Sequence, residues 1–143
     1  MRTTILLPLC LLLFSGCNSS LKLTSKIKQT VYPGLHTEKT YTNYVLNYSA
    51  HTDKIIRIDS IVVFQKGKCY AVNSYLLKKK MSASYSEKIT QKGNYILEIP
   101  LKDGAISSHC KNKRAEISVY YKEGSAAKIM HLDNFETERK TKR

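Results

Sequence analysis

The sequence predicts an all-β fold, an antiparallel sandwich of about seven or eight strands. Two observations carry this prediction: apolar and polar residues alternate through most of the chain after residue 20, and turn residues recur about every ten positions. The length of 143 residues fits one domain, which we expect to span residues 21–135.

The first half of the sandwich is predicted from three segments. Pro33-Gly34 ends the first of them. Residues 43–50 place every second side chain on one face: Tyr44, Leu46, Tyr48 and Ala50. Residues 55–64 are ambiguous by period, because their apolar residues would also line a helix. Six of these ten residues are β-branched, which favours a buried central strand.

The second half contains further turns and alternating runs. Lys66-Gly67-Lys68 returns the chain after residues 55–64, and Glu123-Gly124-Ser125 closes a hairpin into residues 126–132. Residues 95–101 and 115–121 each place an apolar or aromatic side chain at every second position. Residues 75–85 are less regular and fit a loop, an edge strand or one helical turn. Residues 136–143 contain no apolar side chain, so we expect a solvated, frayed, charged tail.

In outline, a sandwich of this size resembles the immunoglobulin-like architecture. The chain has no Trp to pack against a central disulfide, so the resemblance is to the architecture and not to the immunoglobulin family. A small barrel is the alternative.

Residues 1–16 have the proportions of a secretory signal peptide. Arg2 supplies a positive charge, and residues 5–14 form an apolar run before the small residues Ser15 and Gly16. A helix of ten residues covers about 15 Å, roughly half of the hydrocarbon core of a bilayer, so this run does not span a membrane.

The segment Phe14-Ser15-Gly16-Cys17 resembles the lipobox of bacterial lipoproteins, with Phe where that family usually has Leu. The resemblance implies that Cys17 carries fatty acyl groups such as palmitate and begins the mature chain. Residues 17–20 would then be the acylated cysteine and a short polar tether, and several acyl chains anchor durably. An ordinary secreted protein is the alternative. We expect a bacterial envelope protein on the outer membrane, facing the periplasm, because no acidic cluster follows Cys17.

Cys69 and Cys110 remain after processing, in an oxidising compartment where thiols tend to pair. A disulfide between them closes a loop of about 41 residues and contributes roughly 4 kcal/mol in the chain-entropy model. Two free thiols, or a metal site that adds His109, are the alternatives. Neighbouring residues on a strand point to opposite faces, which disfavours a metal ion shared by His109 and Cys110.

Catalytic patterns are weak in this chain. Ser107-Ser108-His109 lacks the nucleophile elbow of a hydrolase, and the 11 acidic residues form no distinct pair. We find no Gly-rich phosphate loop and no zinc-binding spacing. We therefore expect no catalytic residue, no cofactor and no metal.

The excess of basic over acidic residues is the remaining feature of the sequence. The chain has 24 Lys and Arg against 11 Asp and Glu, a net charge of +13 that becomes +12 without Arg2. Lysine-rich strand edges that block aggregation are one interpretation. The other is a patch for an anionic lipid, an acidic glycan or an acidic envelope protein, formed by two segments: Lys78, Lys79 and Lys80, with Lys111, Lys113 and Arg114.

These features favour a lipid-anchored, non-catalytic binding or structural module that binds no nucleic acid. The alternative is an inhibitor or immunity-type lipoprotein that binds a toxin or a lytic enzyme. A charge of +12 would suit an acidic target.

Overall fold

The computed structural model describes residues 20–102, 106–108 and 115–142, and these residues form strands and connections without a helix. The strands are β1 (Leu21–Tyr32), β2 (Tyr41–Ala50), β3 (Ile56–Gln65), β4 (Lys68–Ala71), β5 (Leu76–Lys79), β6 (Lys88–Ile89), β7 (Gly93–Leu101), β8 (Ile106–Ser108), β9 (Ile117–Glu123), β10 (Ala126–Leu132) and β11 (Glu136–Thr141).

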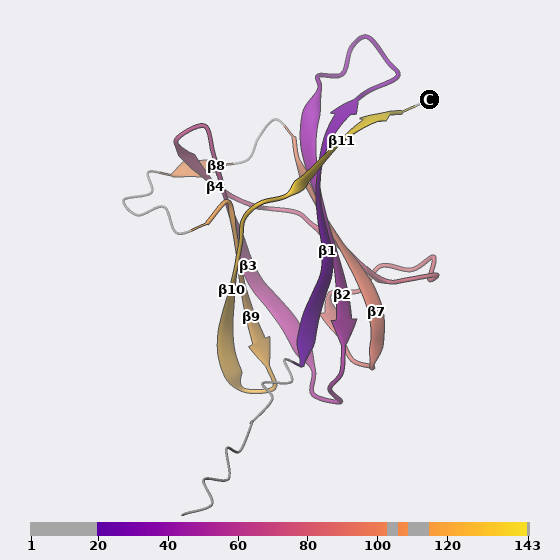
Figure 1. Cartoon of the computed structure of the whole chain (residues 1–143), viewed down its shortest axis with the longest axis vertical. Helices are drawn as coiled ribbons and strands as arrows, with labels where there is room; N and C mark the ends of the chain where they lie inside the picture. The colour runs from indigo at the N-terminus through magenta and orange to yellow at the C-terminus, as the bar shows by residue number, and fades with distance from the viewer. Residues whose placement is uncertain (1–19, 103–105, 109–114, 143) are drawn as a thin grey trace, which may run out of the picture.

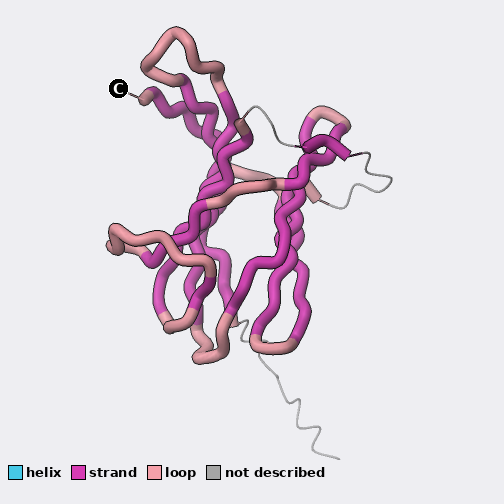
Figure 2. Tube along the Cα trace, turned by 180° about the vertical axis from the view of Figure 1, so that it is seen from behind, coloured by secondary structure: helices cyan, strands magenta, loops and turns pink. Residues whose placement is uncertain are grey.

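The strands form two sheets that face each other (Figure 1; Figure 2). The first has the order β11-β1-β2-β7-β5 and the second the order β10-β9-β3-β4-β8, with β6 paired to β3. The paths β1-β2-β7-β5 and β10-β9-β3 reproduce the ABED and GFC sheets of the immunoglobulin arrangement. Both sheets end in edge strands, so the predicted sandwich is confirmed and the barrel alternative is wrong.

The core lies between the two sheets, where every second side chain of the long strands points inward. In β2 these are Tyr44, Leu46 and Tyr48, as the alternation in residues 43–50 predicts. The fully buried side chains of the other long strands are Val31 in β1, Leu97 and Ile99 in β7, Ile56, Ile61 and Val63 in β3, and Ile117 in β9. Residues 55–64 are a strand and not a helix, in agreement with their β-branched content.

The C-terminal segment corrects one expectation. Residues 136–141 are not frayed: they form β11, which pairs in parallel with β1 from Ile27–Glu136 to Tyr32–Thr141. All six side chains are exposed, as their polarity requires, but strand pairing uses backbone groups and needs no apolar residue. Without β11, β1 would be an open sheet edge.

Residues 75–85 combine two of the three expected forms. Leu76–Lys79 is the edge strand β5, paired with β7, and the residues after it form turns. Leu77 is 2% exposed and anchors this short strand in the core.

Candidate functional site

The chain enters the sandwich at one end, at Ser20. The backbone N–H of His51 donates a 2.7 Å hydrogen bond to the carbonyl of Ser20. The Ser20 side chain hydrogen-bonds the carboxylate of Glu123, which also pairs with the ammonium of Lys128. The hydrogen bond from Lys128, which has the larger effect, and the one from Ser20 hold the pKa of Glu123 below its ordinary value. Ser20 is therefore fixed beside the turns that join β2 to β3 and β9 to β10. We call this the entry end.

Basic side chains gather at the entry end. Lys22 follows the first residue of β1, Lys54 lies in the β2–β3 turn and Lys92 in the β6–β7 turn, and all three are exposed. Asp53 offsets part of this charge through a 3.6 Å ion pair with Lys92. Cys17, the predicted acylation site, lies outside the described residues.

A second basic feature crosses the sheet that contains β3. Arg57 is the register partner of Lys122 on β9 and of Lys88 on β6. Their neighbours Ile56, Tyr121 and Ile89 are buried in the core, so the three cations share the outer face. We call them the basic row. Like charges in directly opposed positions destabilise a sheet, which marks the row as unusual. Alternation in the sequence predicts that each of these residues faces outward. It does not predict which distant strands pair, so the sequence alone did not reveal the row.

Lys78, Lys79 and Lys80 do not share one face. The ammonium of Lys78 lies 5.9 Å from the centre of the Tyr85 ring, and the Lys79 ammonium donates a 3.4 Å hydrogen bond to the side chain of Gln91. Lys78 and Lys79 are successive strand residues and point to opposite sides of β5.

The other half of the predicted patch, Lys111, Lys113 and Arg114, lies outside the described residues. β8, which precedes it in the sequence, is an edge of the opposite sheet from β5. In Figure 1, β8 and the β5 neighbour β7 are on different sides of the molecule. That the two halves meet stays a prediction.

Cys69 is 2% exposed and lies on β4, where its register partner is Ser108 of β8. Cys110 lies outside the described residues, so its pairing with Cys69 stays a prediction.

A polar cluster connects the two sheets. The carboxylate of Glu116 forms a 2.5 Å ion pair with the Lys28 ammonium and accepts a 2.7 Å hydrogen bond from the Tyr44 hydroxyl. Phe135 packs edge-to-face on Tyr44, with ring centres 5.1 Å apart. Burial, followed by the hydrogen bond and negative charge of Glu116, raises the pKa of Tyr44, so its hydroxyl remains a donor. The raised pKa means that Tyr44 is not an activated nucleophile. The cluster links β1, β2 and the start of β9 through Glu116.

We predict that Tyr44→Phe lowers the free energy of unfolding by about 1.5–3 kcal/mol, because it removes a hydrogen bond to a charged group. Tyr48→Phe is the matched control. The Tyr48 hydroxyl is buried without a hydrogen-bond partner among the described residues, so its removal should leave stability unchanged or raise it. Urea unfolding of both variants measures the difference. A larger loss in Tyr48→Phe than in Tyr44→Phe would contradict the assignment.

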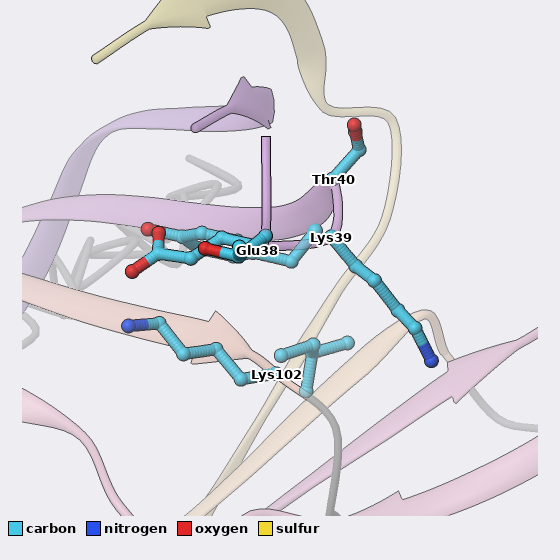
Figure 3. A pocket seen from close by; sticks show the side chains of 7 residues that line it. Glu38, Lys39, Thr40 and Lys102 are labelled. Atoms are coloured by element: carbon cyan, nitrogen blue, oxygen red, sulfur yellow. The ribbon is translucent and has the colours of Figure 1, made fainter. Parts of the chain in front are cut away.

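A surface hollow of about 340 Å³ lies between residues 37–41 and the end of β7 (Figure 3). Lys39 points away from Glu38 and Lys102 in this view, and Thr40 points in a third direction. The ammonium groups of Lys102 and Lys142 lie 5.1 and 5.4 Å from the centre of the Tyr41 ring. Glu38, Lys39 and Thr40 are exposed.

The Ser118 hydroxyl lies 2.9 Å from Nδ1 of His131, on the outer face of β9 and β10. A hydrolytic pair also needs an acid that orients the histidine, and within the described ranges no carboxylate bonds to His131. The same part of the chain contains no group of three or more His, Cys, Asp and Glu residues that could hold a metal ion. His109, which follows Ser107 and Ser108 in the sequence, lies outside the described residues.

No helix long and apolar enough to cross a membrane occurs in residues 20–102, 106–108 and 115–142. Comparison of the chain with models of protein families, with curated proteins and with solved structures found no match.

Proposed function

We propose that this protein is lipid-anchored in a bacterial cell envelope, on the outer membrane facing the periplasm, and acts there as a non-catalytic binding module. The observation that carries the proposal is the sequence Phe14-Ser15-Gly16-Cys17 directly before a folded domain. Leu21 begins β1 only four residues after Cys17, which leaves a tether of three polar residues.

The charge at the entry end supports an orientation in which this end of the domain faces the membrane. Three residues reach about 10 Å when extended, so an acylated Cys17 keeps Ser20 close to the lipid headgroups. The exposed cations Lys22, Lys54 and Lys92 then lie near the membrane. Basic residues near an anionic membrane surface each contribute about 1 kcal/mol to attraction. The acyl groups on Cys17 and the positive charge at the entry end therefore both hold this end of the domain against the membrane.

Partner capture tests the binding role. Cells that make the full chain are treated with a crosslinker, and the chain is purified from the membrane fraction in detergent. We expect covalently linked envelope proteins. A single soluble toxin or lytic enzyme in their place would replace this proposal with the inhibitor or immunity-type function.

Charge at the entry end gives a separate prediction. In the mature chain, residues 17–143 without acyl groups, replacing Lys22, Lys54 and Lys92 with Gln should weaken binding to anionic vesicles by about 1 kcal/mol per charge. The effect should disappear as the salt concentration rises from 0.1 M to 1 M, because the Debye length falls from about 10 Å to about 3 Å. Vesicle co-sedimentation measures the binding.

The matched control replaces Lys78, Lys79 and Lys80 with Gln, which removes the same charge from β5. A smaller effect than that of the entry-end variant supports the proposed orientation. A larger effect would favour the patch that includes residues 78–80.

A further inference from the structure

The four sheet edges differ in their protection against added strands. β11 has exposed charged side chains at four of its six positions, β5 has four residues that include two lysines, and β8 has three residues. β10 has seven residues, with the sequence Ala-Ala-Lys-Ile-Met-His-Leu. Natural sheets protect their edges by shortness and by charge, and β10 has little of either.

The outer edge of β10 is open in the described part of the chain. Its register partners all belong to β9, and no other described strand hydrogen-bonds to its backbone. Figure 1 shows β10 as the last strand of its layer. Lys128, the lysine of this strand, pairs with Glu123 in its own hairpin and leaves the edge uncovered.

The exposed face of β10 combines an apolar and a basic feature. Ile129 is 51% exposed and lies opposite Tyr120 of β9. Two residues earlier, Ala127 lies opposite Lys122, and the row continues to Arg57. Neighbouring strands are about 4.8 Å apart, so a strand added beside β10 would lie about 10 Å from β9. Ala127 is small, and a glutamate on the added strand can extend across it to meet Lys122.

We propose that β10 receives an extended acidic segment of a partner protein by strand addition, with an apolar residue opposite Ile129 and a carboxylate opposite Ala127. Backbone hydrogen bonds supply affinity in this mode of recognition, and alternate side chains supply specificity. Charge complementarity favours an acidic partner over a second copy, since self-pairing would bring two chains of +12 together. This inference specifies the partner of the binding module and rests on that proposed function.

The test uses the full chain in detergent and the capped nine-residue peptide Glu-Thr-Val-Thr-Glu-Thr-Val-Thr-Glu as the probe. Its Glu and Val side chains alternate along one face, so one of each can lie opposite Ala127 and Ile129. We expect binding, together with slower hydrogen exchange of β10 amides. The same peptide with N-methylated backbone amides at alternate positions keeps its charge but loses the donors on one edge. We expect its affinity to fall about tenfold or more, because strand addition depends on those donors.

Three substitutions locate the site. Ile129→Ser and Lys122→Gln should each weaken binding by about threefold to fivefold. Lys140→Gln on β11 removes the same charge from the other sheet and should change the affinity by less than twofold. Circular dichroism confirms that each variant is folded.

Several results would overturn the inference. These are equal binding of the plain and N-methylated peptides, an equal loss in Lys140→Gln and Lys122→Gln, absence of peptide binding, or a stable dimer of the peptide-free chain that pairs through β10. A chain that fractionates with membranes and captures envelope proteins, yet gives any of these results, contradicts the β10 site and leaves the proposed function in place.

Discussion

In cells that make the Cys17→Ser chain, we expect the full precursor to accumulate without acyl groups. The thiol of Cys17 is the acceptor that the lipobox resemblance implies, and a serine hydroxyl does not replace it. The parent chain should begin at Cys17, with 127 residues and a diacylglyceryl group. Intact-mass measurement of both proteins, purified from the membrane fraction, distinguishes the two forms.

Cys10→Ser is the matched control for this experiment. Cys10 lies within the apolar run of the predicted signal peptide and leaves with it, so its replacement should change neither the mass nor the location of the mature chain. A mature N-terminus at any residue other than Cys17 would contradict lipidation at that position, and so would a Cys17→Ser chain of unchanged mature mass apart from the substitution.

The fold was largely predictable because burial of one sheet face leaves a period of two in the sequence. Residues 43–50 show this directly, since Tyr44, Leu46 and Tyr48 are all core residues. β11 left no such pattern: its side chains are exposed on both faces, and it is held by backbone pairing with β1. A strand stabilised in this way is invisible to hydrophobic periodicity.

The candidate sites were less predictable, for a related reason. Alternation shows that Arg57 and Lys122 face outward, but only the register of β3 with β9 places them side by side. The same limit applies to Lys28 and Glu116, which are 88 residues apart and meet between the sheets. Conversely, three successive lysines at 78–80 looked like one patch, although a strand sends neighbours to opposite faces.

The predicted disulfide between Cys69 and Cys110 should have the largest effect on stability. Cys110 follows Ser108, the register partner of Cys69, by two residues. Two residues extend by about 7 Å at most, and disulfides join Cα atoms about 4.4–6.8 Å apart. Opposed residues of an antiparallel pair have Cα atoms about 4.5–5.5 Å apart, so the Cα of Cys110 can lie no more than about 13 Å from that of Cys69. The separation that a disulfide requires falls inside this limit.

Reduction of this bond should lower the free energy of unfolding by about 4 kcal/mol, because the unfolded chain regains the entropy of a loop of about 41 residues. Urea unfolding with and without reductant measures the loss. The Cys69→Ser, Cys110→Ser double variant is the control: it should match the reduced parent and respond no further to reductant.

Cys69 is buried, so its lack of reaction in the folded chain would not be informative. Thiol labelling is therefore done in urea without reductant, followed by peptide mapping. A linked peptide that contains both cysteines confirms the bond, and full labelling of both would show that the two thiols are free.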